Sequence, residues 1–162
     1  SYSVTGVQTC ALPICMDPVN IERFLTNKTF AFVGATTNPR KSGNSIYKEL
    51  KKRGLKLFPV NPKYSEIEGD KCYPGIADIP VKPEAVIIIT PKKETFNVVS
   101  QCIELNIKYV WMQLHADSDD AVQLAKASGI NLVYNKCLLM FVKPVTGVHK
   151  FHRFFAMLFK SS

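Results

Sequence analysis

Runs of apolar, β-branched residues alternate along this chain with segments whose apolar residues recur at helical spacing. The clearest run, EAVIIITP at residues 84–91, is followed by residues 92–106, where Phe96, Val99 and Ile103 favour one face of a helix. Strands that alternate with helices of about 10 to 14 residues are typical of βαβ units, which build parallel sheets through right-handed crossovers. The alternation therefore predicts an α/β fold.

The same alternation extends in both directions from this run. A strand that is apolar throughout is covered on both faces, so we expect helices on both sides of a mainly parallel sheet of about five strands. A short edge strand near residues 71–73 and a helical turn at residues 75–78 should lie between the second and third strands of that sheet. The expected strands are residues 29–35, 55–62, 84–91, 109–114 and 130–137, and the expected helices are residues 44–54, 92–106 and 117–129.

The two ends of the chain differ in composition from the part between them. Residues 1–15 hold no charged side chain, and their VTGVQTCALPI resembles a translated sequencing adapter, so we expect the folded domain to cover residues 16–142. We expect residues 143–162 to form a basic amphipathic helix that packs on the domain or contacts a second copy or a partner protein, with a membrane surface as the alternative. No apolar run reaches the roughly 18 residues that a transmembrane helix needs. The apolar face of the tail helix would carry Val148, Phe151, Phe155 and Leu158.

Charge and cysteine usage limit the classes of ligand and the cellular compartment. The formal net charge is +8, no acidic residue follows Asp120, and a second basic cluster occupies residues 48–56. Such fields attract nucleic acid, anionic lipid or phosphorylated small molecules. Cys72, Cys102 and Cys137 remain once the adapter-like segment is set aside, and their wide spacing argues against a disulfide framework or a zinc site. We therefore expect a protein of the reducing cytoplasm.

The stretch FVGATTNPRKSGN at residues 32–44 has the outline of a phosphate-binding turn between a strand and a helix. Ligands of open parallel sheets bind beyond the carboxyl ends of the strands, where the strand order reverses. A glycine lets the backbone approach a ligand, and a helix start offers free N–H groups to an anion. The candidate ligand-binding residues are Gly34, Ala35, Thr36, Thr37, Asn38, Arg40, Lys41 and Ser42 after the first strand, Asn61, Pro62 and Lys63 after the second, and Thr90 and Pro91 after the third.

Two common nucleotide classes do not match this turn. The dinucleotide fingerprint G-x-G-x-x-G requires three glycines and an acidic residue near the end of the second strand. Only Gly34 is present in GATTNP, and Asn61 and Lys63 stand where the acid would be. The ATP- and GTP-binding loop G-x-x-x-x-G-K-S/T is absent as well. Nicotinamide and triphosphate ligands are therefore disfavoured.

Five segments, taken in order, carry a more specific signature. They are FVGATTNPRKSGNS, FPVNPKYSEIEGDKCYPGIADIP, AVIIITP, YVWMQL and INLVYNKC. From Thr29 to Met140 the chain resembles the stand-alone bacterial CoA-binding proteins, and more distantly the CoA domain of the succinyl-CoA synthetase α subunit. The resemblance implies a Rossmann-like three-layer fold that holds coenzyme A or acyl-CoA across the strand ends.

The resemblance also implies a role for each loop. Residues 34–38 would contact the phosphates and the pantetheine arm, with residues 40–42 nearby. Residues 61–63 would line the nucleotide end, where Lys63 would face the ribose 3′-phosphate, and residues 90–91 would form the opposite wall. CoA carries about four negative charges, which suit charge-assisted hydrogen bonds from such a basic site.

The catalytic potential of the chain rests on a few side chains. His115 follows a strand end at a position where the family usually has a glycine, and it is a candidate substitute donor. His149 and His152 have no third metal ligand nearby, and no base stands beside Cys72 or Cys137. We therefore expect binding without catalysis, as a carrier, sensor or regulatory module. The alternatives are an NAD(P)-binding or CoA-ligase-related enzyme component, and a basic nucleic-acid-binding protein.

Overall fold

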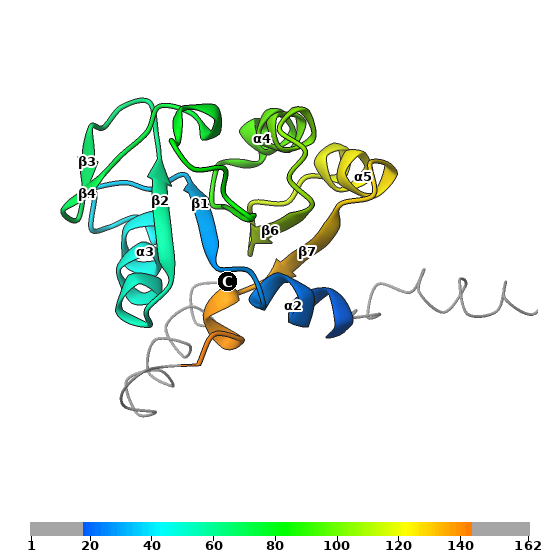
Figure 1. Ribbon diagram of the computed structural model, residues 1–162, viewed down its shortest axis with the longest axis horizontal. Coiled ribbons are helices and arrows are strands. Elements are labelled where there is room, and N and C mark those ends of the chain that lie inside the picture. The colour runs from blue at the N-terminus through cyan, green and yellow to red at the C-terminus, as the bar shows by residue number, and fades with distance from the viewer. Residues whose placement is uncertain (1–17, 144–162) are drawn as a thin grey trace, which may run out of the picture.

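The computed structural model describes residues 18–143 and contains a five-stranded parallel sheet with helices on both faces (Figure 1). The strands lie in the order β2-β1-β5-β6-β7, and every neighbouring pair is parallel. The predicted α/β class and Rossmann-like architecture are confirmed. The adapter-like segment at residues 1–15 lies outside the described residues. The tail, which we expected to be helical, lies outside them from residue 144 onward. The strands are β1 (Thr29–Val33), β2 (Lys56–Val60), β5 (Ala85–Ile88), β6 (Tyr109–Gln113) and β7 (Asn131–Lys136).

Both faces of the sheet are buried, as its apolar strands require. All four residues of β5 are buried. In β1, Phe30 and Phe32 belong to one cluster of buried side chains, whereas Ala31 and Val33 belong to the other. This alternation follows from the period of two along a strand. The central strands are therefore continuous apolar runs because each face packs against another layer.

Helices cover the two faces of the sheet as separate layers (Figure 1). The ranges of α3, α4 and α5 agree with the predicted helices to within two residues at each end. Helix α2 was not predicted, because its eight residues offer only Ile21 and Phe24 as buried apolar anchors. No helix within residues 18–143 has the length and hydropathy needed to cross a bilayer. One face is covered by α2 (Pro18–Leu25) and α3 (Ser42–Lys52), and the other by α4 (Lys92–Glu104) and α5 (Asp119–Ala127).

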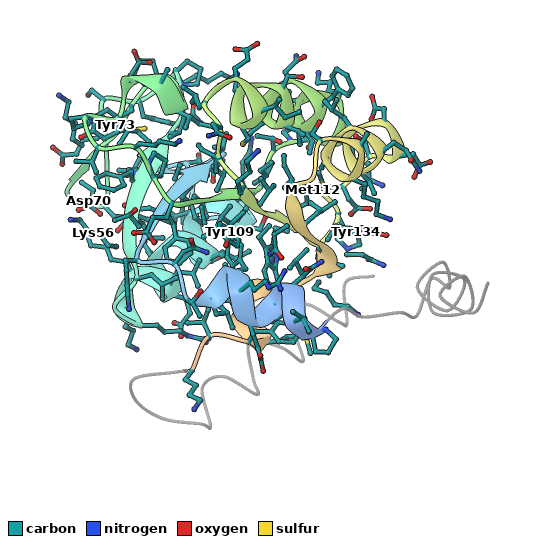
Figure 2. All side chains as sticks on the ribbon, turned by 45° about the vertical axis from the view of Figure 1, so that its right-hand side comes forward. Lys56, Asp70, Tyr73, Tyr109, Met112 and Tyr134 are labelled. Carbon is teal, nitrogen blue, oxygen red and sulfur yellow. The ribbon has the colours of Figure 1, made fainter. Side chains whose placement is uncertain are left out.

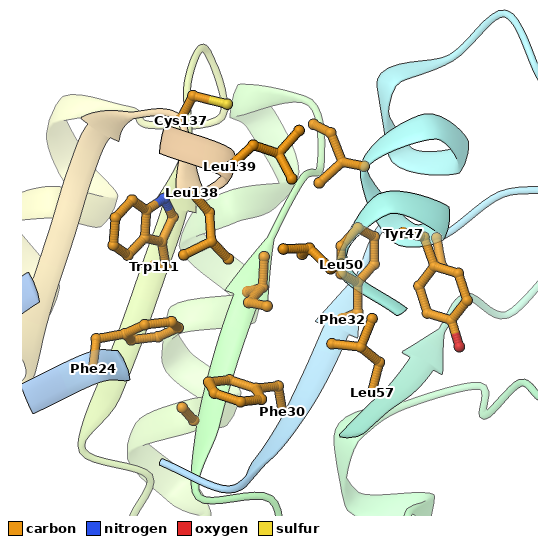
Figure 3. Packing of buried hydrophobic residues seen from close by; sticks show 14 of the residues in the cluster. Phe24, Phe30, Phe32, Tyr47, Leu50, Leu57, Trp111, Cys137, Leu138 and Leu139 are labelled. Atoms are coloured by element: carbon orange, nitrogen blue, oxygen red, sulfur yellow. The ribbon is translucent and has the colours of Figure 1, made fainter. Parts of the chain in front are cut away.

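Aromatic side chains fill much of the core between the sheet and the layer of α2 and α3 (Figure 3). The Phe24 ring centroid lies 5.5 Å from that of Phe30 and 5.3 Å from that of Trp111. Phe32 meets Tyr47 edge-on at 5.2 Å. Such pairs contribute about 0.5–1.5 kcal/mol each beyond the burial of their area. Tertiary packing therefore stabilises the short α2, which is too short to be stable by helix propensity alone.

Trp111 and Gln113, the W-x-Q pair of β6, hold the end of β7 and the segment that follows it. Trp111 Nε1 donates to the carbonyl of Lys136 at 3.1 Å. Gln113 Oε1 accepts from the amide of Leu138 at 3.0 Å, and its Nε2 donates to Cys137 Sγ at 3.0 Å. A buried polar group without a partner costs about 1–3 kcal/mol, so this pairing matters to stability. The motif thus has a structural role in this chain.

Short elements occupy the long connection between β2 and β5. They are the hairpin of β3 (Glu66–Ile67) and β4 (Asp70–Lys71), and the 3-10 helix η1 (Ile76–Asp78). Tyr73 also bridges to Val60 in parallel at the end of β2. The predicted edge strand and helical turn lie close to these elements.

Polar contacts fasten the hairpin to α3. Tyr47 donates to Asp70 at 2.6 Å, and Lys51 pairs with the same carboxylate at 2.8 Å. Lys48 pairs with Glu68 at 3.3 Å. Burial, together with the hydrogen bond to Asp70, raises the pKa of Tyr47, so its hydroxyl remains a donor. These contacts fix the connection after β2 against the helix that follows β1.

Arg53, the residue after α3, anchors the last described segment. Its side chain is 2% exposed. Its Nη1 donates to the carbonyls of Leu139 at 2.8 Å and Val142 at 2.6 Å, while Nε pairs with Glu49 at 2.9 Å. The short 3-10 helix η2 (Leu138–Met140) is thereby bound to α3.

Arg53→Ala should lower the free energy of unfolding by about 2–4 kcal/mol, because two carbonyls and the Glu49 carboxylate lose their donor. Lys52→Ala, one residue earlier and exposed, should stay within about 0.5 kcal/mol of the parent protein. Denaturant unfolding followed by the fluorescence of Trp111, the single tryptophan of the chain, measures both changes. Equal stabilities of the two variants would contradict the anchoring role.

Candidate functional site

The strand order reverses between β1 and β5, because β2 lies on one side of β1 and the later strands extend on the other. In open parallel sheets, ligands bind outside the carboxyl ends of the strands at such a reversal. In Figure 2, Tyr73 lies above Lys56 and Met112 lies above Tyr109, so the carboxyl ends point toward the top. The loops after β1, β2 and β5 meet at this end, and together with Ser42, the first residue of α3, they carry all the ligand-binding residues predicted from the sequence.

Two glycines let the turn after β1 pack closely against its neighbours. Gly34 has a φ of +100°, in the left-handed region, and a Cβ on it would lie 2.6 Å from the carbonyl oxygen of Ile89. A Cβ on Gly43, in the first turn of α3, would collide with the carbonyl oxygen of Gly34. The turn is therefore held between the end of β5 and the start of α3, with backbone against backbone on both sides.

The turn carries backbone N–H groups without an acceptor. Within residues 18–143, the amides of residues 35–37, Ser42 and Gly43 donate no hydrogen bond. Lys41 at the N-cap of α3 makes no side-chain capping bond, and the first turn of this helix contains no acidic residue. The first turn of α5, by contrast, contains Asp119 and Asp120. Free N–H groups at the positive end of a helix dipole form a site for an anion.

Side chains of the turn brace it from within. Thr36 is buried, and its hydroxyl accepts from the amide of Asn38 at 3.2 Å and lies 3.1 Å from the Tyr64 hydroxyl. Asn38 Oδ1 accepts from the amide of Arg40 at 3.0 Å, as in an Asx turn. The side chains of Thr37 and Arg40 remain exposed. The turn therefore keeps its shape through its own short-range bonds.

Asn44, buried in α3, links the turn to the β3–β4 hairpin. Its Nδ2 donates to the carbonyl of Thr36 at 2.9 Å and to Glu68 Oε1 at 3.1 Å. Asn44, Gly43 and Tyr64 were not among the residues predicted from the sequence. A glycine in the first turn of a helix, and a polar residue on its buried face, are unfavourable enough to be signals of a special role. Tyr64 carried no comparable signal.

The Asn61 side chain joins the loop after β2 to the turn after β1. Its Nδ2 donates to the carbonyl of Ala35 at 2.8 Å, and its Oδ1 accepts from the amide of Lys63 at 2.9 Å. Pro62 and Lys63 are exposed beside it. Both polar atoms of Asn61 hold loops in place, and direct contact of this side chain with a ligand stays a prediction.

The third predicted segment contains one buried and one exposed residue. Thr90 is buried, and its hydroxyl lies 3.1 Å from that of Thr95, which donates to the carbonyl of Ala116 at 2.6 Å. Pro91 is exposed at the start of α4. His115 is also exposed, with a φ of +72°, in the loop after β6. Ligand contact by His115 stays a prediction.

Exposed cations surround the turn after β1. Arg40, Lys41 and Lys63 are exposed, and none forms an ion pair within residues 18–143. Hydrogen bonding from the two threonines of the turn lowers the pKa of Tyr64, and the charges of Lys41 and Lys63 lower it further. The electrostatic field at this end of the sheet therefore favours a negatively charged ligand.

The three cysteines within residues 18–143 are free and buried. Burial raises the pKa of Cys72, and it raises the pKa of Cys102 to about 12. Cys137 accepts from Gln113. Nucleophilic cysteines need a thiolate, which such burial disfavours. No group of three His, Cys, Asp or Glu side chains in the described part of the chain could hold a metal ion. The buried Cys72 and Cys102 therefore offer no thiolate, and the anion-binding features of this end of the sheet are the free amides and exposed cations of the turn after β1.

Gly34→Ala should destabilise the fold more than Gly54→Ala. Both glycines have positive φ, +100° and +86°, and a left-handed alanine costs about 1–2 kcal/mol at either position. Only the change at Gly34 also pushes a Cβ into the backbone at Ile89, because nothing lies within 4 Å of a Cβ on Gly54. Thermal unfolding should show a difference of more than about 1 kcal/mol. Similar melting temperatures would be incompatible with the close packing described above.

Comparison with known proteins agrees with this geometry. Residues 28–143 match the family model described as a CoA binding domain. The chain is 32% identical over 130 residues to ADP-forming acetate–CoA ligase I of Archaeoglobus fulgidus, which covers 74% of this chain and 19% of the ligase. It is 33% identical over 91 residues to the α subunit of ADP-forming acetate–CoA ligase II of Pyrococcus furiosus, which covers 56% of this chain and 20% of the subunit.

A solved structure of a hypothetical protein from Pyrococcus horikoshii OT3 matches with a TM-score of 0.74 and 36% identity, covering 81% of this chain and 94% of that one. The chain spans about a fifth of the length of the two curated relatives given above. The family model covers all five strands of the sheet and every predicted ligand-binding residue. The chain therefore belongs to the family of CoA binding domains.

Proposed function

We propose that the chain binds coenzyme A or acyl-CoA at the carboxyl ends of β1, β2 and β5. The observation that carries the proposal is the turn at residues 34–43, which combines free amides, an uncapped helix start and exposed cations inside a CoA binding domain. A diphosphate bound there would accept from N–H groups that break no bond within the described protein. The charge of CoA has the sign that the site favours.

The predicted site residues divide into two groups by burial and bonding. Gly34, Ala35, Thr36, Asn61 and Thr90 would shape the loops, because their side chains are absent, buried or engaged between loops. The second group is exposed and would face the ligand. It consists of Thr37, Asn38, Arg40, Lys41, Ser42, Pro62, Lys63 and Pro91.

The role that we favour is a carrier, sensor or regulatory module for CoA. The thiols of residues 18–143 are buried, and burial raises the pKa of Cys72 and Cys102, which disfavours a thiolate nucleophile. The Pyrococcus horikoshii protein is matched over 94% of its chain, so a unit of this size has been solved without the rest of a ligase. Both observations support binding without turnover.

A second candidate is a component of a CoA ligase, because both curated relatives carry that name. The chain would then supply the CoA site, and a further polypeptide the remaining parts. Formation of ATP from acetyl-CoA, ADP and phosphate by the purified chain would identify it as a complete ligase. We expect no such activity from the chain alone. The nucleic-acid alternative depends on the basic tail, which lies outside the described residues.

CoA and acetyl-CoA should raise the melting temperature of the protein, whereas NAD, NADP and ATP should not. A ligand at 100 times its Kd stabilises the folded state by about 2.7 kcal/mol. For a chain of this size, each kcal/mol raises Tm by about 2–4 °C. Thermal-shift titration measures the effect. A shift with NADP, together with none at millimolar CoA, would overturn the proposal.

Lys63→Glu should weaken the binding of CoA about tenfold or more, because attraction to the 3′-phosphate becomes repulsion. Dephospho-CoA lacks that phosphate and should lose much less affinity. Lys108→Glu is the matched control, since Lys108 is exposed and precedes β6 at the opposite ends of the strands. Calorimetric titration of the parent protein and both variants with each ligand measures the six affinities. Equal losses of affinity for CoA and dephospho-CoA would show that Lys63 does not contact the 3′-phosphate. An unchanged affinity for CoA would show that Lys63 lies outside the site.

A further inference from the structure

A pocket of about 440 Å³ lies at the amino ends of β1 and β2, away from the candidate CoA site. Apolar side chains line it, among them Phe30, Leu55 and Phe141. Its charged residues are Lys28, Lys56 and Lys143, and no acidic residue from the described part of the chain lines it. Lys56 begins β2, below Tyr73 in Figure 2. The pocket therefore combines apolar walls with charges of one sign.

Tertiary contacts hold the walls of this pocket in place. Arg53 donates to the carbonyls of Leu139 and Val142, on either side of Phe141. The Phe141 ring centroid lies 5.6 Å from that of Trp111. Phe30, another lining residue, packs against Phe24 with ring centroids 5.5 Å apart. Small-molecule sites are mostly preformed, mostly apolar and about 300–1,000 Å³ in volume, and this pocket has those properties.

The lysines supply the charge that is available to an occupant. Lys28, Lys56 and Lys143 are exposed and form no ion pair within residues 18–143. Lys56 Nζ lies 5.9 Å from the centroid of the Phe58 ring, on the other face of the sheet from Phe30, so Lys28 and Lys143 are the cations most available to an occupant. The carboxylate of Glu84 accepts from the backbone amide of Lys28 at 2.7 Å, but Glu84 does not line the pocket. Asn27, a polar lining residue, donates to carbonyls at the end of α2. An occupant would thus meet cations and apolar surface.

We propose that this pocket binds an apolar chain that ends in an anionic group, such as a medium-chain carboxylate. The chain would cover the apolar walls, and the anionic group would neutralise the lysines, whose aliphatic stems can extend the apolar surface. The residues after Lys143 include Lys150, Arg153 and Lys160 and no acid, so their charge has the same sign as that of the pocket. Charge complementarity therefore favours a separate anion over this segment as the occupant.

The test uses the full chain and four probes. Decanoate and decyl phosphate have the chain and an anionic group, decanol has the chain alone, and acetate has the charge alone. Trp111 contacts the pocket wall through Phe141, so its fluorescence should change when the pocket fills. We expect decanoate and decyl phosphate to bind, and decanol to bind at least about fivefold more weakly than either. Acetate should not bind. The anion that binds more tightly identifies the preferred head group. Saturating CoA should leave these affinities unchanged.

Charge reversal locates the bound anion. The double change Lys28→Glu and Lys143→Glu should weaken both anionic probes about tenfold and leave decanol unaffected. Lys52 is an exposed residue of α3 that does not line the pocket, so Lys52→Glu should leave all affinities unchanged. The proposal would be overturned if neither anion bound at millimolar concentration or if decanol bound as tightly as the anions. It would also be overturned if the double variant and Lys52→Glu had equal effects, or if CoA displaced the probes. CoA binding itself is measured separately, so failure here leaves the proposed function intact.

Discussion

The backbone of the turn after β1 lies directly against the backbone that follows β5, and the candidate CoA site depends on this close approach. Gly34 makes it possible, because a Cβ there would lie 2.6 Å from the Ile89 carbonyl oxygen. Gly43 lets α3 begin next to the Gly34 carbonyl. The free amides of the turn and those of the helix start are thereby brought into one place, which is how backbone alone forms an anion site. A side chain at either glycine would separate these two sets of donors.

Around this turn, side chains cross-link loops that are far apart in the sequence. Asn61 joins the loop after β2 to Ala35, and Asn44 joins Thr36 to the β3–β4 hairpin. Tyr64 reaches the Thr36 hydroxyl from the loop after β2. Because these side chains bond to the turn after β1, they fix the backbone that carries the exposed cations without needing to contact the ligand. A positioned charge loses less conformational entropy on binding than a mobile one.

The parallel sheet and the phosphate turn could be predicted because their signals are local: apolar runs, helical spacing, and a glycine between a strand and a helix. Other features leave no local pattern. Arg53 bonds to Leu139, 86 residues away, and the W-x-Q motif acts by holding residues 136–138. Helix α2 is too short for a periodic signal and is stabilised by aromatic packing. Asn61 was predicted as a ligand contact, but in the structure its side-chain amide cross-links two loops. A side-chain amide is suited to either role. Residue type alone does not separate these roles.

The two ends of a parallel sheet offer anions different chemistry. Helices that follow parallel strands begin at the carboxyl ends, so backbone N–H groups and helix dipoles gather there. The amino ends lack these donors, and an anion at the pocket must therefore be bound by side-chain cations, here Lys28, Lys56 and Lys143. Charge reversal of a single lysine removes only part of a site built on backbone amides. A site that depends on lysines alone loses its attraction for an anion when their charges are reversed. At the proposed CoA site the backbone donors consequently remain after a lysine is reversed, whereas at the pocket only the apolar walls remain.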